Sequence, residues 1–120
     1  MRSGRTAYLN GLAAEDIAVR LYEARKGQVL ERRWKRRGGE IDLIVRLDGV
    51  VVFVEVKARK SLNLAAESLS VAQQKRLINM ANLYLAESEL GLNADVRFDV
   101  VLVDRSGVAE IIENALSDGW

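Results

Sequence analysis

The sequence predicts an α/β protein in which helices flank a mixed β-sheet. Apolar residues recur at helical spacing in residues 9–26 and 70–90, whereas residues 41–57 and 96–112 are rich in β-branched residues with strand-like alternation. The predicted order is helix, strand, two strands joined by a tight turn, helix, strand and strand, which is typical of a sheet covered by helices. The whole chain of 120 residues, 1–120, is expected to form a single domain.

The first helix is predicted over residues 9–26 and is followed by a short strand. Gly27 is a plausible stop signal after an apolar stripe formed by Leu9, Ala13, Ile17, Leu21 and Ala24. Residues 1–8 show no periodicity and are expected to be frayed. Residues 28–34 favour a short strand, and residues 35–39, Lys-Arg-Arg-Gly-Gly, are expected to form a flexible basic loop.

Residues 41–47 and 50–57 are predicted to form a β-hairpin around Asp48-Gly49. An Asp-Gly pair between β-branched runs favours a type I′ turn, in which both central residues need positive φ. Leu47 then pairs with Val50, and that pair determines the register of the whole hairpin.

This register brings charged side chains of the two strands together on one face. Asp42 lies opposite Glu55, and Glu40 lies opposite Lys57. Because side chains alternate along a strand, these four share their face with Ile44 and Phe53. The opposite face is expected to be core, formed by Ile41, Leu43, Val45, Val52, Val54 and Val56. Like charges about 5 Å apart destabilise a sheet, and a bound divalent cation would remove that repulsion.

The second helix is predicted over residues 70–90, after an irregular stretch over residues 58–69. Ser70 and Gln73 fit a capping box, in which each satisfies a backbone amide at the start of the helix. The helix is expected to end at Gly91 and to bury Val71, Leu77, Ile78, Ala81, Tyr84 and Leu85.

The last part of the chain favours two more strands. Residues 96–104 alternate apolar and polar side chains, and residues 108–112 are expected to form an edge strand. Asp99 is expected to be structural, bonded to a neighbouring loop or to an arginine. Residues 114–120 are expected to be a tail.

Composition excludes several kinds of chemistry. Histidine and cysteine are both absent, so the chain can form no Cys/His zinc site, no imidazole base and no disulfide. Any metal must be held by oxygen atoms, which favours magnesium or manganese as the cofactor. Because no signal-peptide-like or membrane-length apolar run is present, a cytoplasmic protein with no membrane partner is expected.

Charge is unevenly distributed although the net charge is only +1. Residues 25–37 carry seven Lys or Arg against Glu31, a balance of +6, whereas residues 87–120 carry a balance of −6. Such asymmetry suggests a face that meets a polyanion. The residues expected to contact nucleic-acid phosphates are Arg33, Lys35, Arg36, Arg37, Arg59 and Lys75. The alternative for the basic segment is a solvated loop, and Trp34 within it is expected to be core rather than a base-stacking residue.

The charged face of the hairpin suits metal-assisted attack on a phosphodiester. Asp42 and Glu55 could bind a divalent cation with help from the backbone carbonyl of Val56. Lys57 could orient the attacking water or neutralise developing charge, and Glu40 could add a ligand or hold Lys57. Taken alone, Glu-x-Lys is common on strands, and an ordinary ion pair explains these residue types more readily than a catalytic site does.

A resemblance to a known family favours the catalytic site over the ordinary ion pair. The segments Gly39-Glu-Ile-Asp42 and Val52-Phe-Val-Glu-Val-Lys-Ala-Arg59 resemble the YraN-like family of small bacterial proteins. The resemblance continues in Gly11-Leu-Ala-Ala-Glu15 and in Arg97-Phe-Asp-Val-Val101, so that it covers nearly the whole chain. That family is assigned to the restriction-endonuclease-like, PD-(D/E)xK superfamily, although Ile41 here stands where the superfamily name has proline.

The resemblance implies a restriction-endonuclease-like core with the order α-β-β-β-α-β. It implies that Asp42, Glu55 and Lys57 are the nuclease signature and that Glu15 is a first-helix acid that can complete the metal site. A simple salt bridge at the helix edge is the alternative for Glu15.

The function expected from these observations is a nuclease that depends on magnesium or manganese. The substrate is expected to be DNA, selected by structure rather than by sequence, and a homodimer is expected if both strands are cut. The alternative is a non-catalytic nucleic-acid-binding or adaptor module on a nuclease fold. A third possibility is a small interaction protein that uses its second helix.

Overall fold

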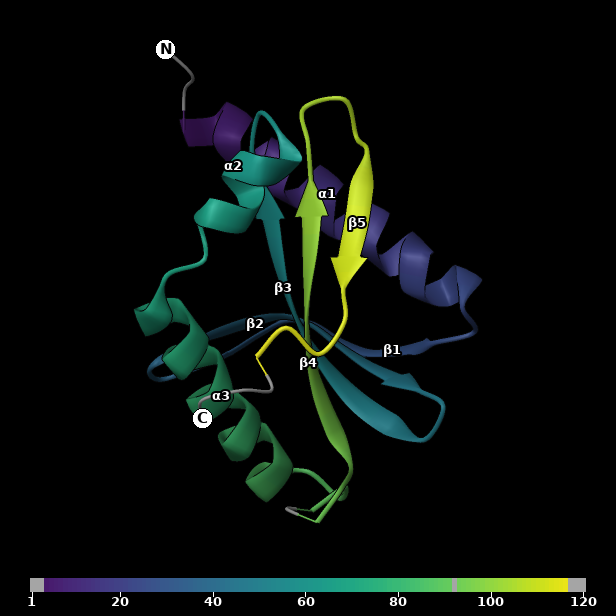
Figure 1. Cartoon of the computed structure of the whole chain (residues 1–120). Helices are drawn as coiled ribbons and strands as arrows, with labels where there is room; N and C mark the ends of the chain where they lie inside the picture. Colours follow the sequence, from purple (N-terminus) through teal and green to yellow (C-terminus); the bar gives the residue numbers. More distant parts are fainter. Residues whose placement is uncertain (1–3, 92, 117–120) are drawn as a thin grey trace.

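The computed structural model describes residues 4–91 and 93–116 and contains five strands and three helices in those ranges. In chain order these are α1 (Gly4–Ala24), β1 (Gln28–Arg36), β2 (Gly39–Leu47), β3 (Val50–Ala58), α2 (Leu62–Glu67), α3 (Val71–Glu87), β4 (Val96–Val103) and β5 (Ala109–Ile112). The predicted α/β class, the order α-β-β-β-α-β and the C-terminal edge strand are confirmed (Figure 1). None of the helices described is long and apolar enough to cross a membrane.

The strands form one mixed sheet in the order β1-β2-β3-β4-β5. Neighbouring strands are antiparallel except for β3 and β4, which are parallel. Parallel neighbours need a crossover connection, which α2 and α3 provide. Helix α3 lies on one side of the sheet and α1 lies on the other, as Figure 1 shows.

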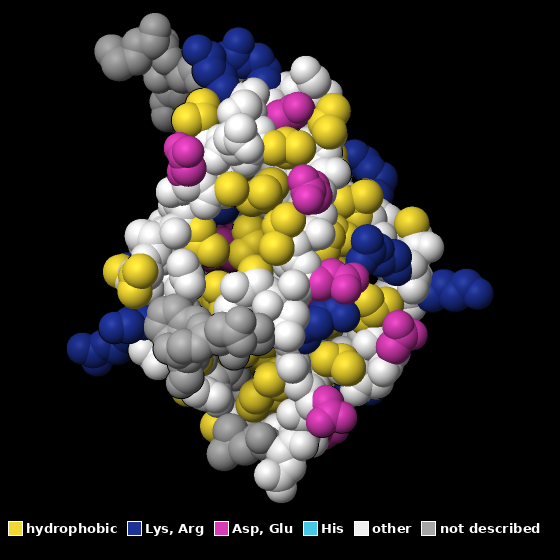
Figure 2. Space-filling view, in the orientation of Figure 1, with side chains coloured by type: hydrophobic (Ala, Val, Ile, Leu, Met, Phe, Trp, Pro, Cys, Tyr) yellow, Lys and Arg dark blue, Asp and Glu magenta, His cyan; other side chains and the backbone are white. Residues whose placement is uncertain are grey.

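Apolar side chains fill both faces of the sheet. The cluster beneath α3 includes Trp34, Ile41, Ile44, Phe53, Leu77 and Tyr84. The cluster beneath α1 includes Ala18, Tyr22, Leu43, Val45, Val54 and Val101. A smaller cluster beneath α2 buries Ala65, Val100 and Leu102, and apolar side chains also gather on the surface over this region (Figure 2). Burial on both faces explains why β3 and β4 read as nearly continuous apolar runs.

The central hairpin has the predicted turn and register. Asp48 and Gly49 adopt φ values of 51° and 77°, as a type I′ turn requires. Backbone pairing runs from Leu47 opposite Val50 to Leu43 opposite Val54. The regular ladder ends there, so the acidic residues lie immediately beyond its last pair.

One face assignment in the hairpin was wrong. Ile41 was expected to share a core face with Leu43, which packs beneath α1, but Ile41 packs beneath α3 with Ile44 and Phe53. Strict alternation is therefore broken between Ile41 and Leu43, at Asp42. The other predicted core residues of that face do pack beneath α1: Leu43, Val45, Val52, Val54 and Val56.

The expected flexible loop over residues 35–39 is mostly strand. Lys35 pairs with Glu40 and Arg36 with Gly39, so the turn between β1 and β2 is only Arg37-Gly38. Strand β1 is irregular because its register shifts between Val29 and Glu31.

The helix boundaries differ in part from those predicted. Residues 4–8 are helical rather than frayed, and residues 62–67 form α2, whose Ser61 hydroxyl accepts a hydrogen bond from the Leu64 amide at 3.2 Å. The capping box of Ser70 and Gln73 is confirmed.

Helix α3 ends at residue 87, earlier than predicted, and its buried positions differ in part from those predicted. Val71 is 61% exposed rather than buried, Ile78 is only partly buried, and Met80 is buried and was not predicted. Helix-end positions depend on caps that compete over a few residues, which explains the earlier end.

The predicted tail begins with an anchored segment. The Ala115 amide donates to the Phe98 carbonyl at 2.7 Å, and Leu116 packs into the cluster beneath α3. The remainder of that tail, residues 117–120, lies outside the described residues, as do residues 1–3 of the predicted frayed start.

Candidate metal and nucleic-acid site

The carboxyl groups of Asp42 and Glu55 meet where the pairing of β2 and β3 ends. The two side chains are within hydrogen-bonding reach of each other. Asp42 Oδ2 also accepts a hydrogen bond from the backbone amide of Val56 at 2.8 Å. The predicted juxtaposition of the two acids on one accessible face is therefore present.

Lys57 lies beside Glu55. Its Nζ is 3.5 Å from Glu55 Oε1, and the residue is only 8% exposed. Lys57 was predicted to face Glu40, but its ion pair among the described residues is with Glu55. The early end of the β2–β3 ladder explains the difference, because residues beyond Leu43 and Val54 are not held in register.

Burial and mutual repulsion shift the ionisation of the two acids. Burial raises the pKa of Glu55 to about 8, the negative charge of Asp42 adds to the rise, and Lys57 opposes it. Burial also raises the pKa of Asp42, against the lowering effect of the Val56 amide. The pair therefore retains a proton near neutral pH, and a cation that binds both carboxylates must displace it.

Glu15 reaches this region from α1. The residue is 5% exposed, its Oε2 lies 3.5 Å from Arg33 Nε, and its buried Oε1 has no hydrogen-bond partner among the described residues. Burial raises the pKa of Glu15, and the charge of Asp42 contributes. The predicted salt bridge is present, and it leaves one carboxylate oxygen unsatisfied.

Arg33 connects two acids instead of facing solvent. Its Nε lies 3.3 Å from Glu40 Oε1 as well as 3.5 Å from Glu15 Oε2. Its backbone has φ 51°, an uncommon conformation for a non-glycine residue, at the irregular part of β1. Arg33 is thus occupied within the protein, which does not favour its predicted role in binding phosphate.

The acids do not form a three-carboxylate metal centre. In the part of the chain that the structure describes, no group of three or more acidic side chains is close enough to hold a metal ion. Glu15 is therefore not brought into one cluster with Asp42 and Glu55. Two carboxylates are still compatible with Mg²⁺, which typically binds one or two carboxylates and keeps several waters.

The two acids open into a hollow of about 440 Å³ between β1, β2, β3 and α3. Three acidic side chains and three basic ones line it together with Gln73: Glu40, Asp42, Glu55, Lys35, Arg36 and Arg76. Glycine at position 39 allows β2 to lie close to α3, because a Cβ at this position would lie 3.2 Å from side-chain atoms of Arg76 and Met80. Sequence reasoning missed Arg76, although its spacing of three residues from the capping Gln73 places both on one helix face.

The other predicted phosphate contacts are distributed more widely. Arg36 pairs with Glu87 at 3.0 Å and lies over the Trp34 ring at 4.5 Å, while Arg37 is exposed on the β1–β2 turn. Lys75 is exposed on α3 but does not line the hollow, and Arg59 lines a different one. Ion pairs with acids from distant segments thus neutralise part of the basic segment.

Trp34 belongs to the core, as expected. It is 8% exposed and packs edge-on against Tyr84 with ring centroids 5.1 Å apart. This burial rules out the alternative role of Trp34 as an exposed surface for stacking bases.

Asp99 forms a second carboxylate centre, on β4. Its oxygens accept hydrogen bonds from Tyr22 Oη at 2.7 Å, from Arg97 Nε and Nη2 at 2.9 Å each, and from the Asn114 amide at 2.9 Å. The predicted structural role, bonded to an arginine and a neighbouring loop, is confirmed. The contribution of Tyr22, 77 residues away in the chain, was not predicted.

Fold and site together define a class of protein: a mixed α/β sheet whose central hairpin presents two acids, one of them paired with a lysine, to a hollow that basic side chains also line. The sequence profile of the Uncharacterised protein family UPF0102 matches residues 14–103, and the chain belongs to this family. The expected YraN-like family is thereby confirmed.

Relatives match over nearly their full length. The chain is 47% identical to a UPF0102 protein of Roseobacter denitrificans, over 99% of this chain and 92% of that protein. It is 48% identical to one of Ruegeria pomeroyi, over 97% and 94% of the two chains. A third, from Azorhizobium caulinodans, is 44% identical over 95% and 87%. These names give a family and no activity.

Proposed function

We propose that this protein is a divalent-metal-dependent nuclease that hydrolyses phosphodiester bonds in DNA. The observation that carries the proposal is the contact between the carboxyl groups of Asp42 and Glu55, with Lys57 beside them, in a hollow walled by basic side chains. Acids that repel each other and open to solvent are typical of a cation site.

The residues present fit a bound Mg²⁺ or Mn²⁺. The donor set is oxygen only, the two carboxyl pKa values are raised in the absence of a cation, and Glu15 Oε1 has no hydrogen-bond partner in the described part of the chain. Asp42 and Glu55 would hold the ion, with the Val56 carbonyl as the proposed third donor. When bound, such an ion supplies Lewis acidity toward the phosphate and lowers the pKa of water.

The chain's own side chains would bind and orient the phosphodiester. Lys57 Nζ, already 3.5 Å from Glu55 Oε1, can hold the attacking water or donate a hydrogen bond to developing negative charge. Lys35 and Arg76 also line the hollow and would hold the phosphates of the substrate strand. Glu40, which lies 3.3 Å from Arg33, would support the wall rather than hold Lys57.

Selectivity is proposed to depend on the shape of the nucleic acid. The basic side chains that line the hollow suit phosphates, and phosphate contacts carry no sequence information directly. Cleavage of both strands of a duplex or junction needs two active sites, so a homodimer is part of the proposal.

A cleavage assay with Mn²⁺ on linear, nicked, flapped and four-way DNA tests the proposal. Asp42→Asn, Glu55→Gln and Lys57→Met are each expected to lower the rate on the order of 10³-fold, because each removes several kcal/mol of transition-state stabilisation. Asp95→Asn, which alters an exposed acid away from the hollow, is the matched control and should leave the rate unchanged.

Wild-type protein that binds these DNAs tightly yet leaves them all intact would refute the nuclease proposal. That outcome would favour the non-catalytic binding module instead, especially if Glu55→Gln binds DNA as tightly as the wild type. Removal of a carboxylate from a purely binding surface lowers repulsion toward phosphates.

A further inference from the structure

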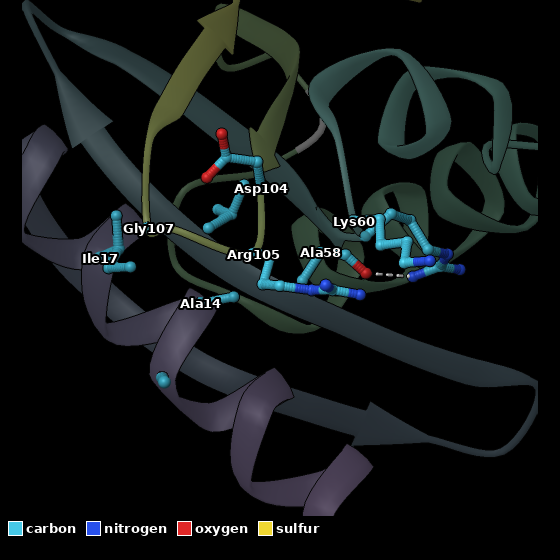
Figure 3. Close-up of a pocket in the computed structure, with 10 residues that line it drawn as sticks. Ala14, Ile17, Ala58, Lys60, Asp104, Arg105 and Gly107 are labelled. Carbon is cyan, nitrogen blue, oxygen red and sulfur yellow. Dashed lines mark hydrogen bonds between the residues drawn. The ribbon is translucent and has the colours of Figure 1, made fainter. Parts of the chain in front are cut away.

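A second hollow, also of about 440 Å³, lies at the carboxyl ends of the parallel strands β3 and β4 (Figure 3). Its wall is largely apolar and includes Ala14 and Ile17 of α1 together with Ala58 and Val103 at the strand ends. In open α/β sheets, ligands commonly bind in the crevice outside the carboxyl ends of strands. The volume is also within the range of ligand pockets, roughly 300–1,000 Å³.

Three cationic side chains, Arg59, Lys60 and Arg105, line this hollow. Figure 3 shows Arg105 extending from the β4–β5 turn toward Ala58 and Lys60. Within residues 4–91 and 93–116, none of the three cations forms an ion pair. The hollow therefore concentrates positive charge that the described protein does not neutralise.

The acid that lines the hollow is already engaged elsewhere. Asp104 Oδ1 accepts hydrogen bonds from the backbone amides of Ser106 at 2.8 Å and Val108 at 2.9 Å. Its carboxylate points away from Lys60 and Arg105 (Figure 3). Asp104 thus shapes the turn and leaves the cations available to an anionic ligand.

Backbone hydrogen bonds bring the two basic segments together. The Arg59 amide donates to the Val103 carbonyl at 3.0 Å, and the Arg105 amide donates to the Lys60 carbonyl at 3.4 Å. The Arg59 guanidinium is itself directed by a 2.7 Å bond to the Ala58 carbonyl. The two basic segments are therefore held side by side at the end of the sheet.

The chemistry of the hollow suits a phosphate ester. Arginine and lysine bind phosphate through charge-assisted hydrogen bonds. The apolar wall of α1 and the volume leave room for an organic group beside the phosphate, which inorganic phosphate would not fill.

We infer that this hollow is a second phosphate-ester subsite, which holds one nucleotide unit of a nucleic-acid strand. The inference rests on the proposed function, because it makes this strand the one that also occupies the hollow of Asp42 and Glu55. Arg59 follows Glu55 by four residues, or about 13 Å along an extended strand. That span corresponds to roughly four nucleotides at about 3.4 Å of rise each. A strand rather than a free nucleotide is favoured because both hollows lie along one strand, β3: Glu55 lines the first hollow and Ala58, the last residue of β3, lines the second.

The test measures binding without cleavage, by fluorescence anisotropy in EDTA, for single-stranded DNA of 2 and 12 nucleotides. Arg59→Ala/Arg105→Ala should weaken binding of the 12-mer at least 10-fold and leave the 2-mer within about twofold, since a 2-mer is too short to span both hollows. Both residues are exposed, so the variant should fold. Arg20→Ala/Arg46→Ala removes the same charge from exposed positions outside both hollows and should weaken the 12-mer by less than about threefold.

Equal losses of 12-mer affinity in the two double variants would overturn the inference. A second outcome would also overturn it. Deoxyadenosine monophosphate would bind the wild type with a dissociation constant below 1 mM, on the order of ordinary metabolite affinities. Arg59→Ala/Arg105→Ala would then lose this binding while its affinity for the 12-mer stayed unchanged. A length-dependent loss in a protein that cleaves no DNA would support the subsite and refute only the nuclease. Conversely, cleavage together with equal losses would refute only the subsite.

Discussion

Two carboxylate centres in the sheet differ in how their negative charge is compensated. Asp99 is fully buried and accepts four hydrogen bonds, two of them from the Arg97 guanidinium. Asp42 and Glu55 are partly buried and in contact with each other, and the donors near them are the Val56 amide and Lys57. Asp99 has enough hydrogen-bond donors to compensate its negative charge, whereas Asp42 and Glu55 together carry more negative charge than the donors near them compensate.

The difference shows which buried charges stabilise the fold and which are available to bind a cation. A buried carboxylate that is fully hydrogen-bonded to an arginine fixes the elements around it, here α1, β4 and the segment after β5. A pair of adjacent carboxylates destabilises the protein until a cation or proton neutralises it. Functional sites commonly depart in this way from rules that the rest of a fold obeys.

Removal of Asp99 should have the largest effect on stability. Asp99→Ala leaves Arg97 and the buried Tyr22 hydroxyl without their partner, and we expect it to lower the free energy of unfolding by about 3 kcal/mol. Urea unfolding followed by circular dichroism measures this change. Asp95→Ala, at an exposed position, should cost less than about 0.5 kcal/mol. If Asp99→Ala lowered the free energy of unfolding by as little as Asp95→Ala does, Asp99 would not be a residue that stabilises the fold.

The acidic pair should make the metal-free protein less stable as pH rises. The pKa of Glu55 is about 8 in the folded protein against 4.5 for a model carboxyl, so the folded state binds more protons between these values. The contribution is fully present below pH 4.5 and is lost as pH rises through about 8. The full difference in pKa corresponds to roughly 5 kcal/mol, and because the pair opens to water, which screens it, we expect a decrease of about 2 kcal/mol over this window.

Glu55→Gln should flatten that dependence, because glutamine carries no titrating proton. Chemical unfolding in EDTA at several pH values between 5 and 8.5 measures it, and Asp95→Asn should retain the wild-type slope. Stability that rises with pH in the wild type would contradict the raised pKa of this pair.

The hydroxyl of Tyr22 should have the smallest measurable effect. Tyr22→Phe removes one of four hydrogen bonds to Asp99, and a bond to a charged group of this kind contributes about 1.5 kcal/mol. Tyr84→Phe is the matched control: its hydroxyl lies 3.5 Å from Glu31 Oε2, so its loss should cost less than about 0.5 kcal/mol. Thermal unfolding separates the two, and equal losses would mean that Asp99 does not depend on Tyr22.

Local signals in the sequence were sufficient for much of the fold. The Asp48-Gly49 turn determined the hairpin register, and the Ser70 capping box located the start of α3. Both features depend on residues within a few positions of each other. The short helix α2 was missed because six residues give too little periodicity to distinguish a helix from a loop.

The site could be predicted only in part, because part of it depends on contacts between distant segments. Asp42 and Glu55 followed from the hairpin register, but the end of the ladder at Leu43 redirected Lys57 from Glu40 to Glu55. The basic segment was read as one phosphate-binding surface, yet Arg33 and Arg36 pair with Glu15 and Glu87 from the two flanking helices. Such pairs arise from packing of α1 and α3 on the sheet, and no local pattern specifies them.

Calorimetric titration of Mn²⁺ into the protein at pH 8 and pH 6 tests the central claim most directly. One binding event is expected at pH 8, weaker by several tens of fold at pH 6, because a carboxyl with a pKa of about 8 is about half ionised at pH 8 and about 1% ionised at pH 6. Binding should be lost in Glu55→Gln and kept in Asp99→Asn if that variant folds, with Asp95→Asn as the folded control. Absence of binding at millimolar Mn²⁺, on the order of a weak metal site, or equal affinity at both pH values would contradict the assignment of Asp42 and Glu55 as a cation site.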